Sequence, residues 1–597
     1  MNMINVTFVN ATDYSRGMAW QPLGILSLVA SLKDKNNIKC NVVELPYLYE
    51  KGILKLSEHS LKQNIMDSVQ YLLASKPDIL SIYTMINTYP YALLLAEEVK
   101  KQTSDVKILF GGPNASFLPK QTLEKYAYVD AVGLGEGEDT IYSIICSVMS
   151  GDFRNALGVA YRDNGEIIVK NQPMELIDVD KLPYVDYSLA MEVIKDRKIS
   201  IEAGRGCPFN CYFCSTNNFW GRKFRIKSPD RIIDEVKYVI ENYGVHNFSF
   251  EHDLFTLKKD VVMKICGGIK AEGLDIIWEC SSRIDTIDDE MMNAMAKANC
   301  RQIFFGIETG SERMQKVIGK NLKLDGIQDV LASCIKYNIQ PTFSFIYGFP
   351  EETQQDLLKT LSLIFYIWDV LNSANFYVSG CIQINQLEYY PETELTIKYF
   401  HMLKTKDTID NIPSIDINKW KDINLKQYFD FSPDIFPNYY TVHNNDLEDY
   451  PFLAFYINHI LLRHLRHFSS SYKLLVSNGL SHLQIYKWLA PIFTDEYIVR
   501  EEYTNKPQIT QICDIFEQLK KIKLYNEGNG IYLGMLQFEY SIFRAKYVLS
   551  DNDVIIQKYK FDVVQLKNDI RNVVLSNLLV KIYKKNGRLY ISKIENK

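Results

Sequence analysis

The sequence lacks the features that mark membrane-spanning or secreted proteins. No stretch reaches 18 uninterrupted apolar residues, and the most apolar run, residues 452–465, contains Asn458, His459 and Arg463. A transmembrane helix needs about 20 such residues. The first ten residues also lack the basic segment and long apolar stretch of a secretory signal peptide. We therefore expect a cytoplasmic protein that has no membrane partner.

An excess of charge of one sign is also missing. The 67 Lys and Arg residues nearly balance 72 Asp and Glu, for a net charge of -5. This argues against a nucleic-acid partner and favours a small-molecule or peptide substrate. Of eleven cysteines, three cluster within eight residues and the others are scattered. Because a disulfide framework would show even, regular spacing, we expect reduced thiols.

The length of 597 residues predicts about three domains. Residues 1–155 alternate short β-branched runs, closed by Gly, Pro or Asn, with helical patterns. Such runs are typical of strands buried on both faces of a parallel sheet, so an α/β, doubly wound Rossmann-like domain is predicted. The expected strands are 4–10, 40–45, 78–84, 106–111 and 130–134, and the expected helices are 23–33 and 91–101.

Two further units follow along the chain. Residues 156–195 are expected to form a linker with a β-ribbon, whose turn is Asp163-Asn164-Gly165. Six strands alternating with helices over residues 196–400 then predict a partial (β/α)6 TIM-type barrel, whose functional groups lie at the C-terminal strand ends. The expected strands are 199–203, 247–251, 276–280, 302–308, 342–347 and 376–385, and the expected helices include 229–242, 259–272 and 288–298.

Residues 401–597 break this rhythm and predict a mixed α+β C-terminal accessory domain. Helices are expected at 453–468 and 481–490, and strands at 554–561, 578–583 and 588–594 around a Lys585-Asn586-Gly587 turn. We expect this domain to cap the barrel and to recognise the substrate.

Three cysteines carry the chemistry most clearly. Cys207, Cys211 and Cys214 stand in the pattern Cys-x3-Cys-x2-Cys, directly after the first barrel strand. Thiolates spaced in this way on one loop can hold an iron–sulfur cluster and leave one iron open. The alternatives are buried structural cysteines or a zinc knuckle. A structural zinc site normally has four ligands, and no fourth Cys or His follows nearby.

With the aromatic Phe213 before its last cysteine, this motif resembles the signature of the radical S-adenosylmethionine enzymes. The resemblance extends over about residues 199–395. It implies a 4Fe–4S cluster whose open iron chelates S-adenosylmethionine, and an external electron donor such as flavodoxin or ferredoxin. Cleavage of the sulfonium would then yield a 5′-deoxyadenosyl radical.

The same resemblance implies S-adenosylmethionine contacts at the ends of the barrel strands. For Glu308 the alternative is a helix cap or a salt bridge at the barrel rim, and a structural role is equally open for Arg283. The candidate residues are Glu251, Asp253, Ser282, Arg283, Glu308 and Gly348.

Glycine-rich turns after the strands of the first domain resemble those of the cobalamin-binding domain found in many radical S-adenosylmethionine enzymes. Glycine lets the backbone approach a large flat ligand closely. No histidine has Asp two positions before it, so we expect no histidine ligand below cobalt; a flavodoxin-like relic without cofactor is the alternative. The candidate contacts are Leu23, Gly24, Ser81, Thr84, Gly111, Gly112, Pro113, Gly135, Glu136, Gly137 and Glu138.

The resemblance implies a cobalamin-dependent methyltransferase that acts on an unactivated carbon of a natural product or peptide. The alternatives are a non-methylating relative that catalyses cyclisation, ring contraction or rearrangement, an enzyme that uses cobalamin only as an electron carrier, and a cobalamin sensor with a structural cluster. No catalytic side chain is evident. Cys280 and Cys381 are candidates because they lie in or at the end of predicted barrel strands, whereas the other scattered cysteines are expected to be small hydrophobic residues.

Overall fold

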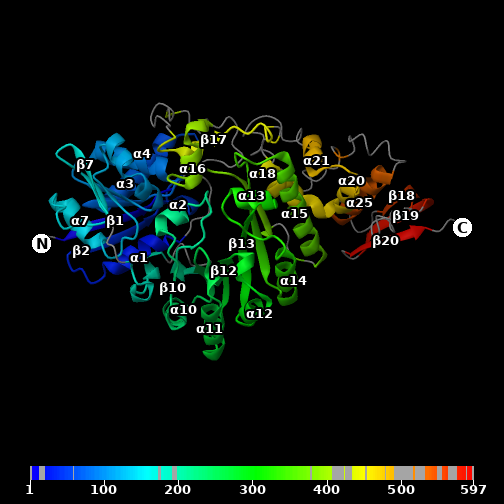
Figure 1. The fold of residues 1–597 in the computed structure, drawn as a ribbon, viewed down its shortest axis with the longest axis horizontal. Helices are drawn as coiled ribbons and strands as arrows, with labels where there is room; N and C mark the ends of the chain where they lie inside the picture. Colours follow the sequence, from blue (N-terminus) through cyan, green and yellow to red (C-terminus); the bar gives the residue numbers. More distant parts are fainter. Residues whose placement is uncertain are drawn as a thin grey trace.

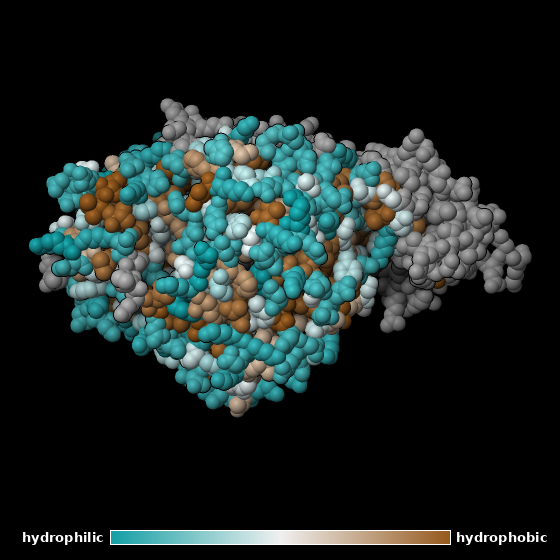
Figure 2. Space-filling view, in the orientation of Figure 1, coloured by the Kyte–Doolittle hydropathy of each residue, from teal (hydrophilic) through white to brown (hydrophobic). Residues whose placement is uncertain are grey.

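The described residues contain a mixed seven-stranded sheet, a parallel six-stranded sheet and a C-terminal region, arranged along the longest axis of the molecule (Figure 1). The computed structural model describes residues 3–12, 21–57, 59–171, 176–190, 198–374, 376, 380–405, 422–423, 433–448, 450, 453–477, 479–489, 515, 517, 519, 531–547, 554–561, 575–585 and 588–594. Within these residues, no helix is both long and apolar enough to cross a bilayer. The face in Figure 2 accordingly intersperses hydrophobic with hydrophilic side chains.

The first sheet has the strand order β2-β1-β3-β4-β5-β6-β7, and its first five strands are parallel. All five predicted strands are confirmed. The strands are β1 Ile4–Asn10, β2 Ile38–Glu44, β3 Ile79–Tyr83, β4 Lys107–Gly111, β5 Ala131–Gly133, β6 Val159–Asp163 and β7 Glu166–Lys170. The helices are α1 Leu23–Ser31, α2 Leu45–Glu50, α3 Leu61–Ala74, α4 Tyr89–Gln102, α5 Pro113–Phe117, α6 Pro119–Lys125 and α7 Ile141–Ser150.

The β-ribbon belongs to this sheet and not to a linker. β6 pairs antiparallel with β5, and Gly133 lies opposite Val159. The predicted hairpin is correct, but its strands continue the doubly wound sheet, so the expected linker begins only after β7. A hairpin pattern defines a local turn and contains no information about the sheet edge that the ribbon joins.

The second sheet is an open, all-parallel partial barrel with the order β8-β11-β12-β13-β14-β15. Its strands are β8 Ile199–Glu202, β11 Asn247–Glu251, β12 Ile277–Ser282, β13 Cys300–Glu308, β14 Gln340–Tyr347 and β15 Ile382–Gln386. The surrounding helices are α10 Pro229–Tyr243, α11 Lys259–Ala271, α12 Asp289–Lys297, α13 Glu312–Val317, α14 Ile327–Tyr337 and α15 Gln354–Ser373. The last strand begins later than predicted, and residues 377–379 of the predicted range lie outside the described residues.

Side-chain amides bind the backbone at both open edges of this barrel. Gln21, just before α1, exchanges two hydrogen bonds of 3.1 Å with the backbone of Ser200 on β8. At the opposite edge Asn458 binds the backbone N–H and C=O of Ile384 on β15, at 3.0 and 2.7 Å. Unpaired strand edges promote aggregation, and here segments from the first domain and the C-terminal region cover them.

The C-terminal region packs its helices into the same hydrophobic core as the barrel. The helix predicted at 453–468 is interrupted: α18 Leu453–Phe455 leads into a π-helix, Tyr456–Leu461, and then α19 Leu462–His464. Further elements are α16 Glu394–Tyr399, β16 Leu403–Thr405, β17 Tyr440–Val442, α20 Ser469–Ser477, α21 His482–Leu489, α25 Ile531–Tyr547, β18 Val554–Phe561, β19 Leu575–Lys585 and β20 Arg588–Ile594. β19 and β20 pair antiparallel as predicted, while the turn residues Asn586 and Gly587 lie outside the described residues.

Candidate functional site

The loop that carries Cys207, Cys211 and Cys214 joins β9 (Gly204–Arg205) to α9 (Thr216–Trp220). Asp253, which follows β11, binds both ends of this loop. One carboxylate oxygen accepts the backbone N–H of Gly206 at 2.9 Å, and the other accepts the hydroxyl of Thr216 at 3.1 Å. Asp253 was predicted to contact S-adenosylmethionine; the structure shows it positioning the cysteine loop.

Glycine is required at the start of the loop. Gly206 has a φ of +82°, and a Cβ there would lie 2.1 Å from the backbone oxygen of Lys223. On the opposite side, the backbone N–H of Tyr212 donates to the oxygen of Ile318 at 2.9 Å, and its C=O accepts from Leu395. Backbone contacts from three segments therefore fix the conformation in which the cysteines are presented.

The thiol of Cys214 influences the thiols of both Cys207 and Cys211. Burial raises the pKa of Cys207, and burial raises the pKa of Cys211 to about 11; Cys214 adds to both shifts. Among the described residues, no three Cys, His, Asp or Glu side chains are placed as ligands of one metal ion. A cubane cluster does not require that arrangement, because each thiolate binds a different iron. Three adjacent free thiols on a rigid loop fit such a cluster.

Positive charge lies beside the cysteine loop. The guanidinium of Arg283, at the end of β12, lies 3.8 Å from the ring centroid of Phe209 inside the loop. It also pairs with Asp285 at 2.8 Å and donates to the backbone oxygen of Lys320. Both Arg283 and Lys320 lower the pKa of Cys211 against the dominant effect of burial. Arg283 thus supports the loop, which is the structural alternative stated above.

Glu308 ends β13 in a left-handed backbone conformation, with a φ of +68°. Non-glycine residues adopt such angles at a cost, and these residues cluster at functional sites. Its carboxylate pairs with Lys320 at 2.8 Å, and both side chains are buried. The salt-bridge alternative for Glu308 is therefore present. Lys320 was missed because a single lysine after a helix carries no sequence signal.

The remaining strand-end candidates differ in their surroundings. Glu251 is exposed and accepts a hydrogen bond of 2.9 Å from Ser200, whereas Ser282 is buried and its hydroxyl bonds that of Thr256. Gly348 has a φ of +91°, and its N–H donates at 2.6 Å to Glu352. Sequence patterns did not indicate Glu352, whose pKa burial raises to about 8.

The two candidate catalytic cysteines are not brought to the site. Cys280 is buried in the barrel's hydrophobic core, where it interacts with Cys300. Cys381 is fully buried just before β15, and its sulfur accepts a hydrogen bond from Gln340. That position is the N-terminal end of a strand, opposite the end that carries the cysteine loop. Strand position alone could not reveal which way each thiol points.

In the first domain, the glycine-rich turn after β4 lies against β3. Gly112 has a φ of +91°, and a Cβ there would lie 2.7 Å from the backbone oxygen of Thr84. The Thr84 hydroxyl donates to Gly111 and accepts from the N–H of Ala115, at 2.9 and 3.0 Å. Thr84 was predicted to contact cobalamin, but its hydroxyl is already used to hold this turn.

Glu136 and Glu138, which follow β5, were also predicted as cobalamin contacts; the structure pairs both with arginines of the two-stranded sheet that β9 forms with β10 (Arg225–Ile226). Arg205 donates to Glu138 at 2.5 Å and to Glu136 at 3.3 Å, and Arg225 also pairs with Glu136. Glu202 is a third carboxylate partner of Arg205. The glycine-rich motif correctly predicts a loop after β5. It contains no information that the carboxylates of this loop form ion pairs with arginines outside the first domain.

Most of the other predicted cobalamin contacts lie along the same carboxyl edge of the first sheet, whereas Ser81 lies in the middle of β3. The backbone N–H of Gly135 donates at 3.0 Å to Ser116, and a Cβ at Gly137 would lie 2.8 Å from the side chain of Leu28. Gly24 is exposed, and Ser81 is buried in β3. Gly111 ends β4 and Pro113 begins α5.

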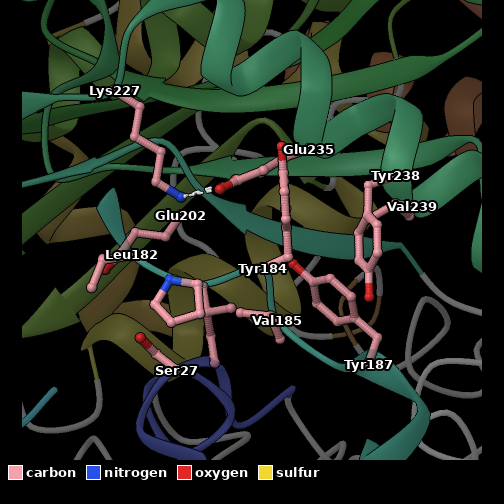
Figure 3. A pocket seen from close by; sticks show the side chains of 12 residues that line it. Ser27, Leu182, Tyr184, Val185, Tyr187, Glu202, Lys227, Glu235, Tyr238 and Val239 are labelled. Carbon is pink, nitrogen blue, oxygen red and sulfur yellow. Dashed lines mark hydrogen bonds and ion pairs between the residues drawn. The ribbon is translucent and has the colours of Figure 1, made fainter. Parts of the chain in front are cut away.

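A small pocket lies near the seam between α1 and α10, and Leu23 and Ser27 line it. Figure 3 shows Lys227 and Glu235 facing each other across it. The lysine donates to both carboxylate oxygens, at 2.7 and 2.9 Å. Because its charged groups satisfy one another, this pocket is not the site that we assign to a ligand.

The helices that follow the cysteine loop and the glycine-rich turn of the first domain are in contact. α5, directly after Gly112, lies against α9, which begins two residues after Cys214. The rings of Phe117 and Phe219 pack edge to face with centroids 6.1 Å apart. The carboxyl edge of the first sheet therefore adjoins the end of the barrel that carries the cysteines.

Comparison with known proteins agrees with this arrangement. Residues 201–364 match the model of the radical SAM superfamily, and residues 13–145 match that of the B12 binding domain. An uncharacterized methyltransferase of Pyrococcus horikoshii is 31% identical over 352 residues, which cover 58% of this chain and 73% of the relative. The chain belongs to the cobalamin-binding radical S-adenosylmethionine enzymes. A 4Fe–4S cluster, S-adenosylmethionine and cobalamin are the cofactors of this family.

More distant relatives differ in their named activities. Cytidylyl-2-hydroxyethylphosphonate methyltransferase of Streptomyces wedmorensis is 24% identical over 55% of this chain and 69% of its own length. The anaerobic magnesium-protoporphyrin IX monomethyl ester cyclase of Cereibacter sphaeroides is 23% identical over 61% of this chain and 60% of its own.

Solved structures share the fold at low identity. The cobalamin-dependent radical enzyme OxsB, with aqua-cobalamin bound, has a TM-score of 0.60 at 15% identity and covers 92% of this chain and 82% of its own. The methyltransferase TsrM of Kitasatospora setae, with cobalamin and an iron–sulfur cluster bound, has a TM-score of 0.55 at 14% identity. The match covers 74% of this chain and 85% of TsrM.

Proposed function

We propose that this enzyme transfers a methyl group from S-adenosylmethionine, by way of cobalamin, to an unactivated carbon of a natural product or peptide. The observation that carries the proposal is the contact of α5 with α9, which brings the glycine-rich edge of the first sheet to the cysteine loop. A substrate between these two loops would be reached from both sides. Effective catalysis requires such positioning of the reacting groups.

We assign three roles to the residues of the site. Cys207, Cys211 and Cys214 hold the cluster, and Asp253 keeps their loop in place through Gly206. The strand ends that carry Glu308 and Gly348 would receive S-adenosylmethionine. When bound, the cofactors supply the radical and the methyl group; the protein orients them and excludes water from the space between.

The pair Glu308–Lys320 would fix the polarity of the S-adenosylmethionine site. Both side chains are buried within hydrogen-bond distance, and Lys320 also influences Cys211. A buried charged pair presents a fixed dipole without reorganisation when a ligand binds. This pair therefore supports a site for a zwitterionic ligand such as the amino acid part of S-adenosylmethionine.

The proposed boundaries are 1–170 for the cobalamin-binding unit, whose sheet includes β6 and β7, 171–195 for the linker, 196–400 for the barrel and 401–597 for the accessory region. None of the described cysteines forms a disulfide, which fits a reducing compartment such as the cytoplasm and an electron donor such as flavodoxin or ferredoxin.

The test follows the methyl group. Anaerobically reconstituted enzyme is given reductant, methyl-labelled S-adenosylmethionine and candidate substrates encoded by neighbouring genes. Label should appear in bound cobalamin and in product. The triple variant Cys207→Ala, Cys211→Ala, Cys214→Ala should lose S-adenosylmethionine cleavage, and Cys146→Ala on α7 is the matched control that should retain it.

Each other outcome has a specific meaning. Cleavage without transfer of label would favour the non-methylating alternative, which the similarity to a cyclase supports. Cleavage that persists in the triple variant would refute the cluster assignment. Absence of cleavage by the wild-type enzyme, with cobalamin bound, would favour the sensor.

A further inference from the structure

Asn114 is buried without using its side-chain hydrogen-bonding groups. It lies in α5, directly after the glycine-rich turn that ends β4, and is 2% exposed. Among the residues that the structure describes, neither its amide nitrogen nor its amide oxygen has a hydrogen-bond partner. Buried polar groups are nearly always paired in native proteins, and each unpaired group costs about 1–3 kcal/mol. The unpaired carboxamide therefore needs a partner that the described part of the chain does not provide.

The backbone around Asn114 is held in place. Its own N–H donates to the oxygen of Thr84 at 3.2 Å, and the N–H of Ala115 donates to the Thr84 hydroxyl at 3.0 Å. Gly112 is packed so tightly against Thr84 that no side chain fits there. The turn therefore cannot easily shift to let the carboxamide find a partner within the protein.

A second buried asparagine of the same domain shows the contrast. Asn64 on α3 is fully buried, and its oxygen accepts the N–H of Ser57 at 2.7 Å while its nitrogen donates to the oxygen of Ser57 at 3.0 Å. Asn64 is thus a satisfied structural asparagine. Asn114 differs from it in lacking any such bonds and in lying at the ligand edge of the sheet, where parallel α/β folds bind their ligands.

We propose that the carboxamide of Asn114 is a hydrogen-bond partner of bound cobalamin and pairs with one of the amide side chains on the rim of the corrin. A carboxamide offers N–H donors and a C=O acceptor, so it matches another carboxamide with two hydrogen bonds. The contact of α5 with α9 places the helix that carries Asn114 on the side of the first domain that faces the cysteine loop. The inference rests on the assignment of cobalamin to the first domain.

The test compares Asn114→Leu with Asn64→Leu in the full-length protein. Binding of hydroxocobalamin is titrated by absorbance, and the Tm is measured without cobalamin. Two neutral hydrogen bonds are expected to be worth about a thirtyfold change in affinity. Asn114→Leu should therefore raise the Kd about thirtyfold and leave the cobalamin-free Tm unchanged or higher, because an unpaired polar group has been removed. Asn64→Leu should lower the Tm and leave the Kd within about twofold.

Two results would overturn the assignment of Asn114. Wild-type affinity in Asn114→Leu would show that the carboxamide does not contact the cofactor. The second result is a fall in the Tm of Asn114→Leu as large as that of Asn64→Leu, together with wild-type cobalamin affinity in the near-isosteric variant Asn114→Asp. This would assign a structural role to Asn114. If wild-type protein itself failed to bind hydroxocobalamin, the assignment of cobalamin to the domain would fail, which is a distinguishable outcome.

Discussion

The ion pairs between the first domain and the barrel allow a quantitative prediction. Arg205 is 4% exposed in its side chain, and Glu138 is 7% exposed. Burial by itself would raise the pKa of Glu138, but the charge of Arg205 and hydrogen bonds from Arg205 and Ser27 hold that pKa below its usual value. Arg205 also directly precedes the glycine that begins the cysteine loop. Its replacement should therefore loosen both the domain contact and the loop.

The two partners should respond unequally. Arg205→Met leaves Glu138 and Glu202 without their guanidinium, and removal of one member of a buried pair costs about 3–5 kcal/mol. Glu138→Gln keeps the shape and leaves Arg205 paired with Glu202 at 2.7 Å, so the loss should be about 1–2 kcal/mol. Arg154→Met, which removes a pair between exposed side chains, is the matched control and should change nothing measurable.

Hydrogen–deuterium exchange measures the effect where it occurs, since a chain with several domains has no single unfolding free energy. A loss of about 3 kcal/mol corresponds to exchange faster by a factor of roughly 100 in residues 133–140 and 203–207. Glu138→Gln should accelerate exchange there by about tenfold. Exchange in Arg205→Met that matches Arg154→Met would refute the view that this network joins the two sheets.

Three further predictions concern single residues. Burial raises the pKa of Glu44 from 4.5 to about 8, so the folded state keeps a proton that the unfolded chain releases. The stability should therefore fall as the pH rises from about 5 to 8, by at most about 1.4 kcal/mol per pH unit. If the Tm falls with pH as steeply in Glu44→Gln as in the wild type, this prediction is wrong. Burial lowers the pKa of His252 from 6.5 to about 4, so the folded state stays neutral where the unfolded chain takes up a proton. The stability should therefore fall as the pH drops from 6.5 towards 4. An NMR titration that finds the imidazole ring charged at pH 6 would contradict this. Gly206→Ala should lose most of the bound iron, because its Cβ would meet the backbone oxygen of Lys223. Gly221→Ala is the control: Gly221 has a φ of +61° with open space around it, so this variant should keep its iron. Equal iron contents in the two variants would show that the close contact at Gly206 is unimportant.

The strands were the most predictable part of the fold. Buried parallel strands appear as short β-branched runs, so β1 and β11 fall on their predicted residues. The π-helical interruption at Tyr456–Leu461 was not predictable from periodicity, because the apolar positions continue through it. The sheet to which the β6–β7 ribbon belongs was not predictable either, since a hairpin is encoded locally and its docking is not.

The site was predictable to the level of loops and less so to the level of partners. Spacing identified the cysteines, and strand ends identified Glu308, but Lys320 became visible only when the fold placed it beside that carboxylate. The same holds for Glu138: its glycine-rich surroundings resemble a ligand loop, and its partner, Arg205, lies 67 residues away. Side-chain pairing across domains depends on tertiary geometry, which has no local sequence signature.

The contact between the two sheets combines polar and apolar groups, and this bears on how the two domains stay together. Gln21 binds the edge of β8 through two amide hydrogen bonds, and Arg205 joins the same end of the barrel to Glu138. Leu26 of α1 packs into the hydrophobic cluster of the barrel, and Phe117 packs edge to face on Phe219. Burial of apolar side chains resists separation in water, and breaking a buried ion pair is costly because it leaves an uncompensated charge. Several independent contacts thus hold the two cofactor-bearing loops together, which is what a radical reaction shielded from water requires.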